Sequence, residues 1–226
     1  MTTMVSNLEL LRRIPVFSRL TPSQAESIAE ALEKRRFRRG EVLAQQHAHS
    51  DLLFILLTGR VRVTSTDKCG RQLVLCKLRG GDLLDEMSLI DNEPHTATMQ
   101  AETHTDVLTL GRTDFLRCLQ ENTHVAHAVM VRLVQRLRQA DRKIESFALL
   151  DVHGRVIRSL LEHAEQGPDG TMVIREKISR QDIAKMVGAS REMVSRVMKD
   201  LEARGYTQTD ASCQITLQGP FMQDFL

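Results

Sequence analysis

The sequence predicts an α+β protein: an N-terminal antiparallel β-roll of the jelly-roll kind, then a long helix, then a C-terminal winged helix-turn-helix. Three observations predict this order. Short apolar runs separated by turn residues occupy residues 41–110, helical periodicity occupies 122–148, and short capped helices follow. The boundaries that we expect are 1–120 for the roll, 121–150 for the long helix, 151–220 for the winged domain and 221–226 for a tail.

The composition is that of an ordinary globular protein. A chain of 226 residues with 42% hydrophobic and 27% charged residues has room for two domains and a connector. Aromatic residues reach only 4%, which disfavours the stacking surfaces of single-strand nucleic-acid binders. We find no signal peptide and no run of 18 apolar residues, so we expect no membrane contact and a cytoplasmic location.

The roll is expected to follow two short helices, at residues 8–14 and 22–34. Pro22 comes directly after Thr21, which is a common start of a helix. The strand pattern then begins at Glu41. Its apolar runs are separated by turn residues at Gly59, at 67–70 and at 80–82, and this even spacing favours an antiparallel roll.

Residues 122–148 carry the clearest helical pattern. Apolar residues recur in alternating steps of four and three between charged flanks, which favours a coiled-coil contact between two copies of the chain. This seam comprises Ala126, Met130, Leu133, Leu137, Ala140, Ile144 and Phe147. The alternative is an amphipathic helix that lies on its own roll.

Capping residues divide the C-terminal part into short helices. Asp151 is a candidate N-cap near Gly154 and marks a hinge before a helix at 154–165, which ends at the breaker 166–170. Ser179 and Asp182 form a capping box, Gly188 ends that helix, and Ser190 caps the next. A turn of about three residues between two helices is the helix-turn-helix layout.

The last of these helices has two distinct faces. Val194, Val197, Met198 and Leu201 recur at i, i+3, i+4 and i+7 and form its buried face. The opposite face suits base reading, because arginine pairs with guanine and glutamate accepts from cytosine, although a solvated polar face would look similar. Arg180, Gln181 and Lys199 suit phosphates. The DNA-binding candidates are Arg180, Gln181, Ser190, Arg191, Glu192, Ser195, Arg196 and Lys199.

Residues 205–217 alternate around Asp210-Ala211-Ser212, which predicts a two-stranded wing. Residues 147–155 and 187–196 resemble the hinge and the recognition helix of the cyclic-AMP receptor protein/Fnr (Crp/Fnr) family of bacterial transcription regulators, and the resemblance spans nearly the whole chain. It implies a cyclic-nucleotide-binding roll, a dimerisation helix and a winged helix-turn-helix.

The resemblance also implies a homodimer on a palindromic, TGTGA-like site in double-stranded DNA, with RNA polymerase as a further partner. Arg191, Glu192 and Arg196 match the residues that read this half-site, and Glu192, Ser195 and Arg196 fit the E-x-x-S-R pattern of the Fnr branch. The cysteine cluster of the Fnr iron-sulfur centre has no counterpart near this N-terminus.

Residues 85–97 resemble the phosphate-binding cassette of the family, with departures. Asp85 replaces a glycine and brings a negative charge, and His95 replaces an arginine that would clamp the phosphate. Ala140 and Asp141 replace the pair that contacts adenine. These changes disfavour cyclic AMP and leave cyclic di-GMP, another anion or no ligand open. The candidate effector residues are Asp85, Glu86, Met87, Ser88, His95, Thr96, Ala97, Ala140 and Asp141.

Other chemistry finds little support. The four cysteines are scattered, and His47 and His49 lack a third ligand, so we expect no metal. The sequence has no P-loop, G-x-S-x-G or H-E-x-x-H motif, so we assign no catalytic residue and no enzymatic activity. The alternative function is a cyclic-nucleotide-binding signalling module whose winged helix contacts protein. The basic runs at 34–39 and 132–143 are either binding patches or solvated faces.

Overall fold

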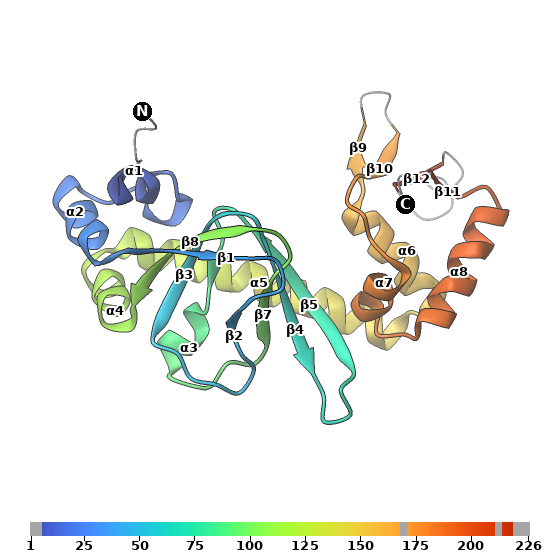
Figure 1. Cartoon of the computed structure of the whole chain (residues 1–226), viewed down its shortest axis with the longest axis horizontal. Helices are drawn as coiled ribbons and strands as arrows, with labels where there is room; N and C mark the ends of the chain where they lie inside the picture. The colour runs from blue at the N-terminus through green and yellow to red at the C-terminus, as the bar shows by residue number, and fades with distance from the viewer. Residues whose placement is uncertain (1–5, 168–170, 211–213, 219–226) are drawn as a thin grey trace. The chain divides into compact units, whose positions relative to one another are not determined.

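The computed structural model describes residues 6–167, 171–210 and 214–218 (Figure 1). The chain divides into two compact units, residues 1–137 and 138–226. The expected wing-turn residues Ala211 and Ser212 and the tail at 221–226 lie outside the described residues. In the part of the chain that is described, no helix combines the length and apolar character needed to cross a lipid bilayer.

The first unit begins with α1 (Asn7–Arg12), the 3-10 helix η1 (Pro15–Phe17) and α2 (Pro22–Ala31), which begins at a capping box on Thr21. The predicted helix at 22–34 was too long at its C-terminal end. Strand β1 (Glu33–Phe37) follows α2, and it pairs antiparallel with β8 (Thr105–Gly111) along its whole length. This long-range pairing outweighs the local helical periodicity, so the roll begins before Glu41.

The roll consists of two antiparallel sheets with the strand orders β1-β8-β3-β6 and β2-β7-β4-β5, which confirms the predicted fold class of this unit. The two helices associated with the strands are α3 (Glu86–Asp91) and α4 (Arg112–Glu121). The remaining strands are β2 (Val42–Ala44), β3 (Leu52–Thr58), β4 (Arg60–Thr66), β5 (Gln72–Arg79), β6 (Leu83–Leu84) and β7 (Thr98–Ala101).

Strand β3 supplies residues to two hydrophobic cores because successive side chains point to opposite faces of a strand. Leu53 and Ile55 pack with Phe115 of α4 and with the N-terminal helices. Phe54 and Leu56 instead pack in a second cluster with residues of β4 and β8. The two cores hold the sheets together and fix the position of α3.

The long helix, α5 (Thr123–Leu149), confirms the predicted helix at 122–148. Its first turns bury Val125 and Val129 in the core of the roll, and Leu133 packs against the same core. Four residues of the predicted seam are exposed, among them Leu137 at 61% and Ile144 at 64%. The alternative interpretation, an amphipathic helix that lies on its own roll, is therefore correct for the start of α5. For the exposed residues, a dimer contact stays a prediction.

The second unit contains α6 (Val152–His163), α7 (Arg180–Val187) and α8 (Arg191–Ala203). Its sheet has the strand order β11-β12-β10-β9, all antiparallel. These strands are β9 (Glu165–Gln166), β10 (Met172–Ile174), β11 (Thr207–Thr209) and β12 (Ile215–Leu217).

One sequence prediction for this unit needs correction, since the helix expected at 154–165 begins earlier, at Val152, and ends at His163. The two-stranded wing predicted at 205–217 is confirmed by the antiparallel pairing of β11 with β12. β10 and β9 extend this pair to four strands, and the sequence analysis did not foresee these two short strands.

Candidate functional site

The helix-turn-helix is defined by its caps, and the structure confirms those predicted. The hydroxyl of Ser179 accepts a hydrogen bond from the Asp182 backbone N–H at 3.1 Å, and the Asp182 carboxylate accepts from the Ser179 N–H at 3.3 Å. Gly188 ends α7 with φ +62°, a left-handed conformation that glycine adopts at little cost. Ser190 then caps α8 by accepting from the Met193 N–H at 3.2 Å.

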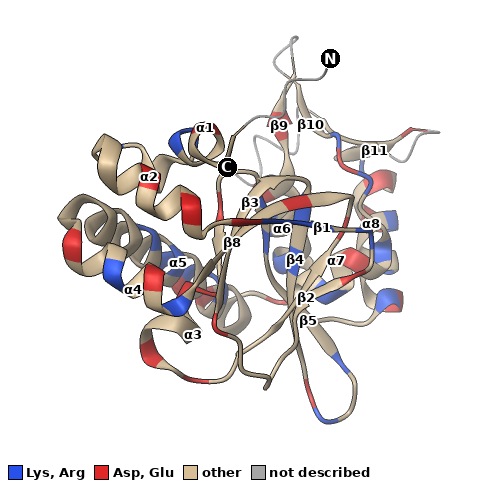
Figure 2. Ribbon diagram, turned by 60° about the vertical axis from the view of Figure 1, so that its left-hand side comes forward, with Lys and Arg blue, Asp and Glu red and all other residues tan. Residues whose placement is uncertain are grey.

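Helix α8 separates its apolar residues from its polar ones. Val194, Met198 and Leu201 are fully buried, while Val197 is only partly buried. The other side of the helix presents charged side chains to solvent, and Figure 2 shows these positions along its length. The exposed residues are Arg191, Glu192, Arg196 and Lys199, with Ser195 partly exposed among them.

The charges on α8 are available to an external partner. Arg191, Arg196 and Lys199 form no ion pair with a carboxylate in the described residues. Hydrogen bonds from the backbone N–H of Glu192 and from the hydroxyl of Ser190 lower the pKa of the Glu192 carboxyl, so it is ionised at neutral pH. This face therefore offers cationic donors and one anionic acceptor, which is the set that reads base edges.

Arg180 differs from these residues because it has a partner within the domain. Its Nη2 donates to Oε1 of Glu202 at 2.9 Å, and the hydroxyl of Thr209 donates to the same oxygen at 2.9 Å. One carboxylate thus connects the start of α7, the end of α8 and β11. Sequence reasoning missed Glu202, since neither of its two donors lies within one helical turn of it. Gln181, the neighbouring candidate, is exposed.

Several contacts hold the end of α5 against α6. Asp151 accepts from the Gly154 N–H at 2.8 Å, which confirms it as the N-cap. The guanidinium of Arg155 lies 5.3 Å from the centre of the Phe147 ring, a cation–π distance. Arg158 pairs with Glu145 at 3.4 Å. The predicted hinge is therefore spanned by side-chain contacts, and Phe147 of the predicted seam takes part in one of them.

The cassette residues at 85–97 lie around a buried pair of side chains. Asp85 has a left-handed backbone with φ +74°, and its Oδ1 lies 2.7 Å from Nδ1 of His95. Both side chains are only 1% exposed, and burial raises the pKa of the Asp85 carboxyl. The hydroxyl of Ser88 lies 3.3 Å from the same nitrogen. Sequence reasoning named these three residues but did not foresee that they contact one another.

The other candidate effector residues have varied environments. Glu86 is fully buried and pairs with Nη1 of Arg136 at 2.5 Å, an ion pair that sequence reasoning missed. Ala97 is buried, whereas Met87 and Thr96 are exposed. The remaining two, Ala140 and Asp141, are exposed positions of α5 in the second unit.

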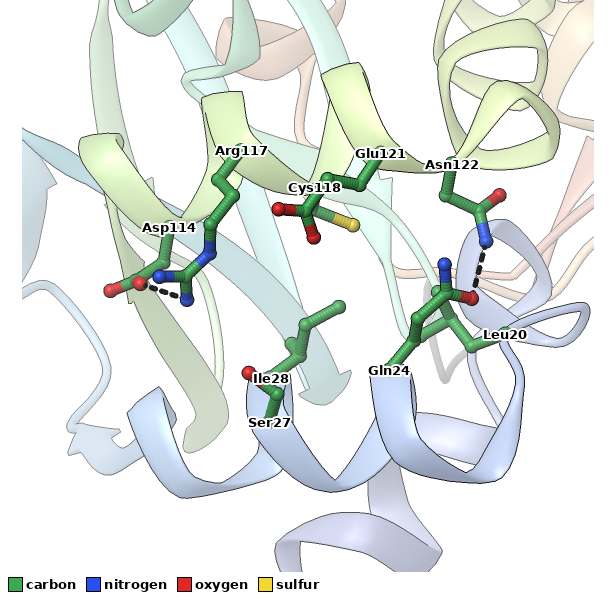
Figure 3. Close-up of a pocket in the computed structure, with 9 residues that line it drawn as sticks. All are labelled: Leu20, Gln24, Ser27, Ile28, Asp114, Arg117, Cys118, Glu121 and Asn122. Atoms are coloured by element: carbon green, nitrogen blue, oxygen red, sulfur yellow. Dashed lines mark hydrogen bonds and ion pairs between the residues drawn. The ribbon is translucent and has the colours of Figure 1, made fainter.

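A small hollow lies between α2 and α4 in the first unit, away from every residue set that the sequence suggested. Figure 3 shows Asn122 turned toward Gln24, whose Oε1 accepts its hydrogen bond at 2.9 Å, and Arg117 paired with Asp114. Burial raises the pKa of the Cys118 thiol to about 11, so this thiol stays protonated and weakly nucleophilic. Within the described residues, no group of His, Cys, Asp and Glu could hold a metal ion.

Comparisons with known proteins match both units. A family model of the cyclic nucleotide-binding domain matches residues 34–122, and a model of the Crp-like helix-turn-helix domain matches residues 154–220. The cAMP-activated global transcriptional regulator Vfr of Pseudomonas aeruginosa is 32% identical over 181 residues, covering 76% of this chain and 83% of Vfr.

Two further relatives extend these matches. The cyclic AMP receptor protein of Thermus thermophilus is 30% identical over 191 residues, covering 84% of this chain and 87% of that protein. The c-di-GMP responsive global regulator CLP of Xanthomonas campestris has a similar structure, with a TM-score of 0.76 and 24% identity over 88% of this chain and 100% of CLP. The last comparison supports the fold alone.

Proposed function

This chain belongs to the Crp/Fnr family of DNA-binding transcription regulators, and from that premise we propose that it acts as a homodimer on a palindromic, TGTGA-like site. We propose that the chain has three functional parts, which are a sensor roll at 1–120, a dimerisation helix at 121–150 and a DNA-binding domain at 151–220. We propose that it acts in the cytoplasm, where its DNA is, with RNA polymerase as a partner. Its proposed role is regulatory rather than enzymatic.

The observation that carries this proposal is the exposed polar face of α8. Arg191 and Arg196 can each donate two hydrogen bonds to guanine, and the ionised Glu192 can accept from cytosine. Ser190, Ser195 and Lys199 provide contacts to bases or phosphates. Gln181, exposed in the first turn of α7, is proposed as a phosphate contact, whereas Arg180 acts by holding Glu202.

A palindrome needs two copies of α8, and the exposed apolar residues of α5 support a contact that would supply them. Met130 is 56% exposed, and Leu137 and Ile144 are more exposed still. Apolar side chains at heptad spacing lose contact with water when two such helices pair. We propose that these residues, with the partly exposed Ala126, form the centre of the dimer contact.

The roll matches the family model of the cyclic nucleotide-binding domain, so we propose that it is a ligand-binding domain, and cyclic nucleotides and dinucleotides are the ligands to test against it. We propose that cyclic AMP is not the effector, because Asp85, His95, Ala140 and Asp141 depart from the pattern that the resemblance implies.

Fluorescence anisotropy with two duplexes tests the DNA proposal. One duplex carries TGTGA half-sites as an inverted repeat, centred about one helical turn of 10–10.5 base pairs apart, and the other is scrambled. We expect preference for the palindrome at moderate salt, and loss of that preference in Arg196→Ala. Arg19→Ala removes one exposed charge from the first unit, outside both basic runs, and serves as the control. Equal binding of both duplexes by the unaltered protein would contradict the proposal.

A further inference from the structure

We infer that Asp85 and His95 determine the ligand specificity of the sensor domain, because their buried pair fills the cassette and excludes a phosphate anion. The inference rests on the proposed function in one respect, which is that the roll is a ligand-binding domain. It goes further by naming two residues and the chemical class of ligand that they reject.

The pair is held in place from several sides. His95 Nδ1 lies 2.7 Å from Asp85 Oδ1 and both side chains are buried, although neither oxygen of Asp85 takes part in a hydrogen bond of standard geometry within the described residues. The backbone of His95 is fixed as well, since its N–H donates to the Ala48 carbonyl at 2.9 Å and its carbonyl accepts from the His47 N–H at 2.8 Å. If a ligand displaced the His95 ring, the protein would lose the buried contact with Asp85. The ligand would have to make contacts of at least equal free energy in its place.

The charges around the pair also oppose an anion. Asp82 and Glu86 lie close to Asp85 in the chain, and each is paired with an arginine of α5. Arg136 pairs with Glu86 at 2.5 Å, and Arg132 pairs with Asp82 at 3.0 Å, so both guanidinium groups already have a carboxylate. Together with Asp85 there are three carboxyl groups against two arginines. An entering phosphate would meet no guanidinium among these groups that lacks a carboxylate partner.

The backbone indicates how to reverse the specificity. Asp85 has φ +74°, in the left-handed region that glycine occupies without strain, so Asp85→Gly keeps the local conformation while it removes the carboxylate. His95→Arg then provides a cation with no partner. Asn92→Gly is the matched control, because Asn92 is left-handed at the other end of α3 and is not part of the pair.

Thermal unfolding tests the inference with the full-length protein and no DNA, so its result is separate from that of the DNA experiment. The probes are cyclic AMP, cyclic GMP and cyclic di-GMP. We expect no rise in Tm for the unaltered protein or Asn92→Gly, and a saturable rise for Asp85→Gly/His95→Arg with at least one probe.

Two results overturn the inference. One is a rise in Tm of the unaltered protein equal to that of the double variant, and the other is a folded double variant that no probe shifts. If the double variant does not fold, Asp85→Asn takes its place, since it removes the charge at nearly constant volume. Nucleotide binding by Asp85→Asn but not by the unaltered protein then supports the inference, and binding by neither overturns it.

Discussion

The recognition helix and the sensor cassette use similar residues in opposite ways. On α8, Arg191 and Arg196 are exposed and form no ion pair within the described residues. Beside the cassette, Arg136 is paired with the buried Glu86, and Asp85 is paired with His95. Charges that are already paired inside the protein gain little from an external anion, whereas exposed unpaired ones are free to bind one. From this difference we expect the chain to meet its polyanion at α8 and not in the roll.

The largest expected effect comes from breaking the buried pair. His95→Ala leaves the Asp85 carboxylate buried without its partner, and losing one member of a buried pair typically costs about 3–5 kcal/mol of stability. We expect a loss of this size in the free energy of unfolding measured with urea. His49→Ala, at an exposed histidine of the same unit, should change it by less than about 0.5 kcal/mol. Equal losses in both variants would show that the pair is not stabilising.

The next effect concerns α8 and separates base reading from phosphate contact. Arg191→Ala should cost about 1–3 kcal/mol on the preferred duplex and relax discrimination at one base position. Lys199→Ala should instead weaken binding to all sequences and reduce the slope of log affinity against log salt by about 1. Binding titrations over a salt series with single-base variants of the duplex measure both. If Arg191→Ala lost the same affinity for every duplex, Arg191 would not be a base-reading residue.

A smaller effect is expected from the cap of α8. Ser190→Ala removes the acceptor of the Met193 N–H, and the loss of an N-cap costs about 0.5–2 kcal/mol. Ser195→Ala is the control, because it removes a hydroxyl from the interior of the same helix, where alanine is well tolerated. Chemical denaturation followed by circular dichroism compares the two. The capping role would fail if both serine variants lost the same stability.

The smallest effect is on reactivity rather than on stability. At pH 8 an alkylating reagent should modify the exposed Cys69 and leave Cys118 unmodified, since its thiol has a pKa of about 11 and is buried. Only as the pH approaches that value does the thiolate of the folded protein become abundant. Peptide mass spectrometry before and after denaturation in urea measures the difference. Rapid labelling of Cys118 in the folded protein would contradict its assigned environment.

Local signals in the sequence predicted much of the fold. Ser179, Gly188 and Ser190 act within one helical turn of their partners, so their roles follow from spacing alone. The apolar period likewise predicted α5. It could not distinguish Val129, which is buried on the roll, from Met130, which is exposed, because that depends on the surrounding fold.

What the sequence missed depends on contacts between distant residues. β1 becomes a strand through its pairing with β8, some seventy residues later. In the sequence, Asp85 and His95 were two separate departures from the phosphate-binding cassette of the family. The structure shows that each compensates for the other, which only the folded path of residues 85–95 makes possible.

The left-handed backbone at Asp85 has a consequence for the history of this site. Aspartate and glycine codons differ by one base, and so do those of histidine and arginine. Because the local conformation already suits glycine, the change at Asp85 needs no rebuilding of α3. If Asp85 and His95 exclude nucleotides as we infer, two point mutations separate this cassette from one that admits them. Substitutions at these two positions would then change the response to a nucleotide without any change in the DNA-binding domain.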